Sequence, residues 1–199
     1  MPGELKIQIP APNIKLMKVK IKGITPLIYN KWSEKAKQMI KDKQAKKANK
    51  GREVRNPEKE YEESFYYDKD GKIAFPALNI KQCIVSAARL IEGVTMVVLR
   101  SSVFVVGDMD GYIPVTYKDK SMREDMVRVG MGSADIRYRG QLTDWSMEFV
   151  IKLNADVLSP EQVLNLLQIA GFSCGIGEWR PERNGDFGTF EIETEEKAV

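Results

Sequence analysis

The sequence has no histidine, and its only cysteines are Cys83 and Cys174. Without histidine, the commonest general base and metal ligand is missing, and so is every Ser-His or Cys-His nucleophile pair. The two cysteines stand in unrelated contexts, so we expect no structural zinc, no other metal and no cofactor. Their apolar and glycine neighbours predict two buried free thiols in a reducing compartment. An enzyme is therefore not the expected class.

Long apolar runs are also missing. No stretch approaches the roughly 18 uncharged apolar residues that a membrane span requires, and the N-terminal residues lack the apolar centre of a signal peptide. We therefore expect a cytoplasmic protein with no membrane partner. The hydrophobic share of 43% and the length of 199 residues predict one globular domain over residues 1–199.

The net charge of +3 is small but unevenly distributed. Residues 31–59 contain eleven lysines and arginines but only four acidic residues, so the positive charge of the chain is concentrated there. The apolar stripe of this segment is thin, which predicts an inserted, solvated helix or loop over about 31–60, ended by Gly51 and Pro57. Its basic side chains are candidate phosphate contacts, and a plain soluble surface helix is the alternative. The candidates are Lys46, Lys47 and Arg52.

Six other segments carry the periodicity of a strand or a helix. Their order is strand, helix, strand, strand, helix, strand. That order is typical of the ferredoxin-like (RRM-like) α+β fold, in which two helices cover one face of an antiparallel sheet. The segments are 16–23, 79–93, 94–106, 145–153, 160–170 and 187–193.

Two hairpins are predicted outside this frame. Residues 61–75 flank the turn dipeptide Asp70-Gly71. Residues 118–140, within an insertion over about 107–143, are charged and weakly patterned, which favours a long β-hairpin arm that offers Arg137 and Arg139 to a ligand. The acidic C-terminal tail is expected to fray.

The first strand places three lysines on the face opposite its apolar residues. Such a basic stripe is a candidate contact for a phosphate backbone. Lysines on an edge strand also prevent aggregation, which is the alternative. The three are Lys18, Lys20 and Lys22.

Glycine is concentrated between the last helix and the last strand, in GFSCGIGEWRPERNGDFGTF (171–190). Such a backbone can adopt positive φ and turn N–H groups toward an anion. Arg180 and Arg183 carry the donor geometry that phosphate favours, and Trp179 could stack on a base. Alternatively, the glycines only shape a long loop and Trp179 is a core residue. The candidate glycines are Gly175, Gly177, Gly185 and Gly188.

Three segments resemble the RAMP superfamily of CRISPR-associated and related phage proteins. KIKGITPLIY resembles its opening strand and Gly-x-x-Pro-Leu turn, FPALNIKQCIVSAAR its proline-led first helix, and GIGEWRPERNGDFGTF its glycine-rich loop. The resemblance implies binding of RNA or single-stranded DNA along the sheet and the glycine loop. It also implies side-by-side assembly or a place in a nucleoprotein complex, in a bacterial, archaeal or phage-infected cell.

We therefore expect a non-catalytic protein that binds single-stranded nucleic acid, with RNA preferred over DNA. Family members that cut RNA frequently use histidine, which this sequence lacks. Two alternatives stay open. One is a metal-independent or aspartate-assisted endoribonuclease, and the other is a phage structural or sequestering protein that binds a protein or a small nucleotide.

Overall fold

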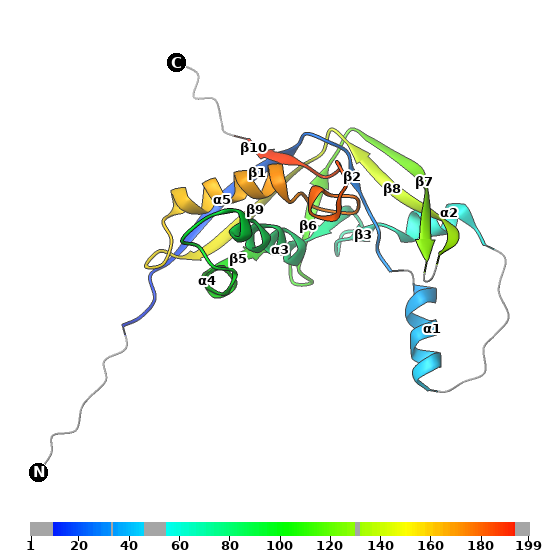
Figure 1. Ribbon diagram of the computed structural model, residues 1–199, viewed down its shortest axis with the longest axis horizontal. Helices are drawn as coiled ribbons and strands as arrows, with labels where there is room; N and C mark the ends of the chain where they lie inside the picture. Colours follow the sequence, from blue (N-terminus) through cyan, green and yellow to red (C-terminus); the bar gives the residue numbers. More distant parts are fainter. Residues whose placement is uncertain (1–9, 33, 46–54, 130–131, 194–199) are drawn as a thin grey trace, which may run out of the picture.

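The computed structural model describes residues 10–32, 34–45, 55–129 and 132–193 (Figure 1). Its central part is a four-stranded antiparallel sheet in the order β10-β1-β9-β5, with two long helices inserted in the connections. This arrangement confirms the predicted ferredoxin-like α+β fold. Its six elements are β1 (Ile14–Gly23), α3 (Ala77–Ala87), β5 (Val103–Val106), β9 (Ser146–Asn154), α5 (Pro160–Ser173) and β10 (Phe190–Ile192).

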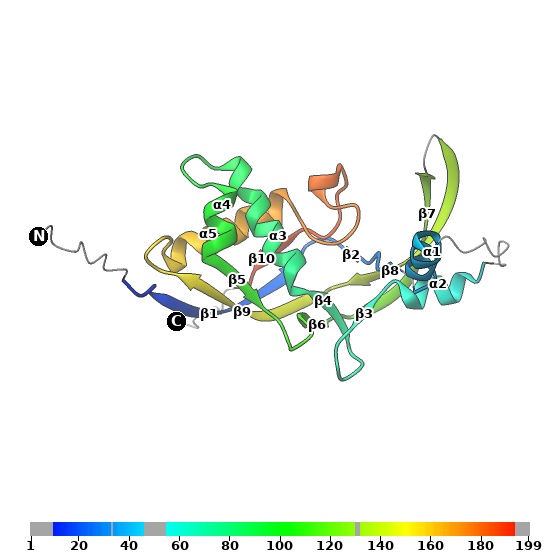
Figure 2. The ribbon, with the colours of Figure 1, turned by 90° about the horizontal axis from the view of Figure 1, so that it is seen from below.

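The core lies between this sheet and the two helices, which cover the same face (Figure 2). Strands β1 and β9 pair so that Val19 stands opposite Phe149, and both are buried. Because strand residues alternate between faces, the lysines of β1 lie on the other side of the sheet. Helix α5 begins with a capping box, in which Ser159 and Gln162 exchange two hydrogen bonds of 2.9 and 3.2 Å.

Three strands extend the sheet beyond β9: β6 (Tyr112–Thr116), β4 (Ile73–Pro76) and β3 (Tyr66–Tyr67). The predicted hairpin is present as β3 and β4, joined through Gly71 at a φ of 75°. The hairpin was predicted to start at residue 61, which is wrong because residues 61–63 belong to helix α2 (Pro57–Glu63). Asn56 caps this helix and proline occupies its first turn, so Pro57 begins a helix instead of ending one.

The predicted arm is present as two long paired strands, β7 (Asp119–Val129) and β8 (Ser133–Thr143), which stand away from the sheet (Figure 2). The short strand β2 (Leu27–Ile28) joins β8 and ties the arm to the body. The basic insertion forms helix α1 (Glu34–Gln44), also outside the core (Figure 1). The C-terminal residues 194–199, including most of the predicted acidic tail, lie outside the described residues.

Residues 94–106 depart from the predicted strand. Most of them form helix α4 (Met96–Ser102), which is capped by Thr95, and only the last four residues form β5. The fully buried Leu99 anchors α4. Tertiary packing and a side-chain cap here override the strand preference of β-branched residues such as Val97 and Val98.

Both long helices differ from prediction at their ends. Helix α3 begins at Ala77 with no side-chain cap, because the Ala77 N–H donates to Gly111 O at 2.9 Å. Asn79 therefore does not cap this helix, and its side-chain amide remains available. Helix α5 continues through Gly171, where a Cβ would lie 2.2 Å from Phe190 O. Glycine allows the helix to approach β10 at this point.

The two thiols connect these helices. Cys83 and Cys174 are both buried and free, as predicted. Cys83 Sγ donates to Ala170 O at 3.4 Å, and the Cys174 N–H donates to the same oxygen at 3.0 Å. Interaction with the neighbouring Cys174 thiol, together with burial, raises the pKa of Cys83 well above its ordinary value. In the part of the chain that the structure describes, no helix is long and apolar enough to cross a membrane.

Candidate nucleic-acid interface

The glycine-rich segment between α5 and β10 is a folded loop whose glycines are needed for its shape. Gly175, Gly177 and Gly188 have φ values of 65°, 80° and 67°. A Cβ on Gly188 would lie 1.8 Å from Ile176 O, and one on Gly185 would lie 1.9 Å from Trp179 O. We call residues 174–189 the glycine loop.

Backbone N–H groups of the glycine loop are largely used inside the protein. The Ile176 N–H donates to Gly188 O at 2.9 Å, and the Gly188 N–H donates to Pro26 O at 2.9 Å. Glu178 donates to Ile28 O at 2.9 Å, which holds the loop against β2. These amides are not free to bind an anion, so the geometry favours the alternative in which glycines shape the loop. Any ligand contact must then come mainly from side chains.

The predicted base-stacking residue, Trp179, connects the glycine loop to the arm. Its backbone has a φ of 54°, and its indole Nε1 donates to Asp125 Oδ2 at 3.0 Å. The Arg139 guanidinium lies 5.8 Å from the centre of its ring. Trp179 is partly buried, and both contacts hold it against β7 and β8.

Arg139 is buried in the same cluster. Its side chain is 7% exposed and pairs with Asp125 at 3.0 Å and with Glu178 at 3.6 Å. Burial would raise the pKa of Asp125, but hydrogen bonds from Arg123, Arg139 and Trp179 hold it below its ordinary value. We call these five residues the arm–loop junction. Arg139 holds the arm against the glycine loop, and its buried, paired side chain is not accessible to a ligand.

The two predicted phosphate-binding arginines of the glycine loop have different surroundings. Arg180 donates to Gly177 O at 2.9 Å and pairs with Glu182 at 3.0 Å. Glu182 also accepts from Ser86 Oγ at 2.7 Å, and these bonds lower its pKa despite burial. The side chain of Arg183 is exposed and makes no hydrogen bond or ion pair with any described residue, although its backbone N–H donates to Arg180 O at 2.8 Å. Arg183 alone is uncommitted.

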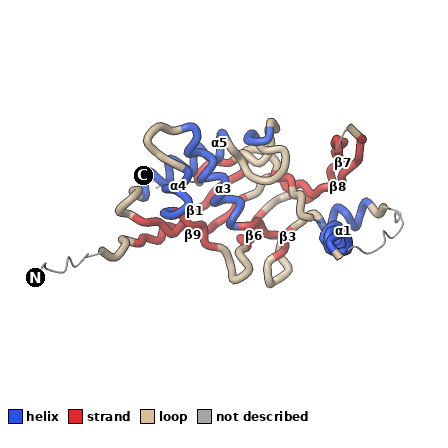
Figure 3. The backbone as a smooth tube through the Cα atoms, turned by 60° about the horizontal axis from the view of Figure 1, so that its bottom comes forward, coloured by secondary structure: helices blue, strands red, loops and turns tan. Residues whose placement is uncertain are grey.

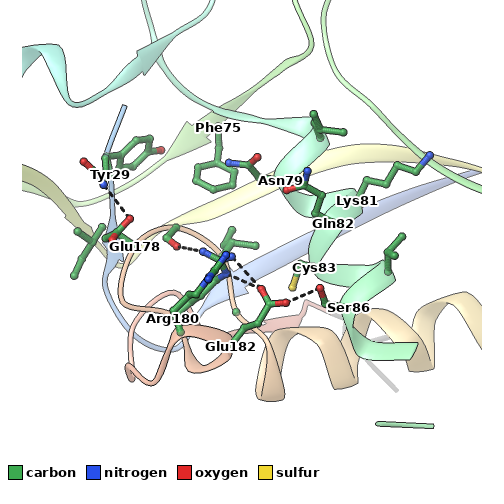
Figure 4. Close-up of a pocket in the computed structure, with 18 of the residues that line it drawn as sticks. Tyr29, Phe75, Asn79, Lys81, Gln82, Cys83, Ser86, Glu178, Arg180 and Glu182 are labelled. Atoms are coloured by element: carbon green, nitrogen blue, oxygen red, sulfur yellow. Dashed lines mark hydrogen bonds and ion pairs between the residues drawn. The ribbon is translucent and has the colours of Figure 1, made fainter. Parts of the chain in front are cut away.

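A pocket of about 650 Å³ lies between α3 and the glycine loop (Figure 4). Three cationic side chains that line it have no carboxylate partner among the described residues: Lys81, Arg100 and Arg183. Lys81 Nζ donates to Arg100 O at 2.8 Å and lies 3.9 Å from the centre of the Phe104 ring. Burial lowers the pKa of Lys81. This is the part of the site where positive charge is available to an anion.

Lys81 and Arg100 were not among the sequence candidates. Each is a single cation in an otherwise apolar or mixed helix, and no local pattern distinguishes either from a solvated surface residue. Packing of α4 against α3 brings them together, and the glycine loop adds Arg183 from a position about 80 residues further along the chain. These residues are remote in the sequence, so only the tertiary structure shows that they line the same pocket.

The remaining predicted residues do not line the pocket. Lys18 pairs with Glu148 at 2.8 Å and Lys20 with Glu193 at 2.8 Å, on the open face of the sheet. Lys22 is exposed on the same face. Arg137, on the arm, pairs with Asp135 at 3.1 Å. The candidates Lys46, Lys47 and Arg52 lie outside the described residues.

No cluster of three or more carboxylate or thiol side chains that could hold a metal ion occurs among residues 10–32, 34–45, 55–129 and 132–193. The backbone course in Figure 3 shows that the arm and α1 lie at one end of the molecule and the helices over the core sheet at the other. The pocket belongs to the body of the protein, on the helical side of the sheet.

No family model matches the sequence, and no curated protein matches it either. Solved structures do match. One is a chain of a type III-B Cmr-beta complex bound to cognate target RNA, with 12% identity and a TM-score of 0.56. What the two chains share is the fold. The alignment covers 92% of this chain and 60% of that one, so this protein spans less than two thirds of its neighbour. Cmr6 from Pyrococcus furiosus is 10% identical, with a TM-score of 0.47, over 91% of this chain and 98% of Cmr6.

Proposed function

We propose that this protein is a non-catalytic subunit that binds single-stranded nucleic acid, RNA in preference to DNA, in the pocket between α3 and the glycine loop. One observation carries the proposal: Lys81, Arg100 and Arg183 line a single pocket, and none of them has a carboxylate partner among the described residues. Cations that are already paired gain little from a phosphate, whereas unpaired cations bind it and release counterions. Most other cations considered above are held by acidic groups.

The structural likeness supports RNA as the ligand class. The neighbouring chain belongs to a complex bound to target RNA, and the sequence resembles the RAMP superfamily in three segments. Side-by-side assembly, other subunits of a nucleoprotein complex and a cytoplasmic site are parts of the same proposal. Light scattering of the protein with and without a long oligonucleotide tests this assembly. If copies bind side by side, the mass of the complex should increase in steps of one protein chain.

The non-catalytic part of the proposal rests on the lack of histidine, which removes the usual general acid and base for RNA cleavage. Labelled RNA incubated with the protein, with and without magnesium, should remain intact. Cleavage in either condition would favour the endoribonuclease alternative. Absence of any salt-sensitive shift with oligonucleotides would favour the sequestering alternative.

The decisive experiment is a polarisation titration with single-stranded RNA and DNA at two salt concentrations. The pocket variant is Lys81→Ala/Arg100→Ala/Arg183→Ala. We expect it to lose at least about tenfold in affinity and to have a shallower salt dependence, by about 0.7 per lost phosphate contact. A variant of the β1 lysines, Lys18→Ala/Lys20→Ala/Lys22→Ala, is the control because it removes the same charge from the open sheet face.

The β1 variant should bind within about twofold of the parent. The opposite result, with affinity lost in the β1 variant and kept in the pocket variant, would move the interface to the open face of the sheet. It would then agree with the lysine stripe that the sequence suggested.

A further inference from the structure

The pocket has a second wall that phosphate contacts do not use. Asn79 and Gln82 lie three residues apart on α3, so they occupy the same helix face, and both line the pocket. Neither amide makes a hydrogen bond to any described residue. Each amide offers two donors and an acceptor. The two side chains therefore present hydrogen-bonding groups with no partner in the part of the chain that the structure describes.

The start of α3 explains why Asn79 is available. An asparagine near a helix start usually caps it. Here the chain enters the helix through Pro76, and the first N–H is satisfied by Gly111 O at 2.9 Å. Figure 4 shows Asn79 and Gln82 on the pocket side of α3, across from Arg180 and Glu182. The backbone has thus placed a free amide where a cap was expected.

Aromatic residues line the pocket beside these amides. Tyr29 contacts Phe75 and Tyr66, with ring centres 5.7 and 6.4 Å apart, and all three line the pocket. Tyr29 is 1% exposed, and its buried hydroxyl has no hydrogen-bond partner. A buried polar group without a partner is costly and is rare in folded proteins. The hydroxyl is enclosed and out of a ligand's reach, so Tyr29 contributes to the pocket by supporting the rings of Phe75 and Tyr66.

Size and chemistry together point to a base. Pockets for small organic ligands measure roughly 300–1,000 Å³, and the volume here is about 650 Å³. Single-stranded RNA is read through unstacked bases, whose edges carry both donors and acceptors. Asn and Gln amides match adenine in particular, because they can donate to and accept from its edge at the same time.

We infer that this pocket receives one unstacked base of the bound strand, preferably adenine, whose edge is read by Asn79 and Gln82. The inference rests on the proposed function, in which Lys81, Arg100 and Arg183 hold the phosphates on either side. It adds base preference to a site that otherwise recognises only a charged backbone.

The test compares four fluorescent RNA oligomers of equal length: oligo-A, oligo-U, oligo-C and a strand in which every base is removed. We expect the parent to bind oligo-A about five- to tenfold more tightly than the abasic strand. The variant Asn79→Ala/Gln82→Ala should lose this preference and keep the salt dependence. A matched control, Gln44→Ala/Asn165→Ala, removes the same groups from exposed positions on α1 and α5 and should retain the preference.

The two proposals fail in different ways. Salt-sensitive binding of all four oligomers with equal affinity would overturn the base pocket and leave the nucleic-acid function standing. A base preference that survives in Asn79→Ala/Gln82→Ala would also overturn it. Absence of binding to every oligomer would overturn the proposed function itself.

Discussion

The arm–loop junction and the pocket lie on the two sides of the glycine loop, and both contain arginine. In the junction, Arg139 is buried against Asp125 and Glu178, and its charge is neutralised before any ligand arrives. In the pocket, Lys81 and Arg183 have no carboxylate partner among the described residues. The comparison shows that positive charge in a sequence indicates binding only where the fold leaves it unpaired. The junction fixes the geometry, and the pocket is where a ligand can bind.

The largest expected effect comes from breaking the junction. Arg139→Ala removes the more buried of the two arginines that pair with the buried Asp125, which should lower the free energy of unfolding by about 3–5 kcal/mol. Arg137→Ala removes an exposed arginine from the same strand, 46% of whose side chain is accessible, and should change stability by less than about 0.5 kcal/mol. Denaturant unfolding measures both. Equal, small effects would show that the junction does not hold the arm.

The next effect concerns the shape of the glycine loop. Gly188→Ala introduces a Cβ at a φ of 67° and 1.8 Å from Ile176 O, so it should destabilise the protein by more than about 2 kcal/mol. Gly71→Ala has a similar φ of 75° with open space around it, and should cost only about 1–2 kcal/mol. Thermal unfolding of the two variants separates backbone strain from steric overlap. Similar melting temperatures would contradict the tight packing of the loop.

A smaller effect distinguishes the two arginines that the sequence treated alike. Arg183→Ala should weaken RNA binding about threefold to tenfold and leave stability unchanged, because its side chain is exposed and unpaired. Arg180→Ala should do the reverse, since this residue bonds Gly177 O and Glu182. Parallel titrations and melting curves provide the measurement. If Arg180→Ala weakened binding more than Arg183→Ala in a fully folded protein, the assignment would be wrong.

The smallest effect is a dependence on pH. The folded-state pKa values of Asp125 and Glu182 are both lowered by their partners. Such groups add stability above their unfolded pKa, near 4, and lose it as the pH falls through the lower folded value. The melting temperature should therefore be flat from about pH 5 to 8 with respect to these groups and fall below about pH 4. The melting temperature of Asp125→Asn should fall less steeply below about pH 4. An identical fall in the parent and the variant would show that Asp125 does not contribute to the loss of stability in acid.

Much of the fold was predictable because its signals are local. Apolar alternation in β1 and β9, the Ser159 capping box and the Asp70-Gly71 turn each lie within a few residues and indicate the same element whatever surrounds them. Predictions failed where packing decided. Residues 96–102 became a helix because Leu99 is buried and Thr95 caps it, although β-branched residues favour strands in isolation.

The sequence by itself determined the order of the six elements of the ferredoxin-like frame, the long arm, the need for glycine ahead of the last strand and the lack of histidine chemistry. Tertiary structure alone decided which charges are available. Trp179 and Asp125 meet across 54 residues, and Lys81, Arg100 and Arg183 line one pocket from three separate segments. Ion pairing depends on a few ångströms of separation, and no periodicity in the chain encodes such distances between remote residues.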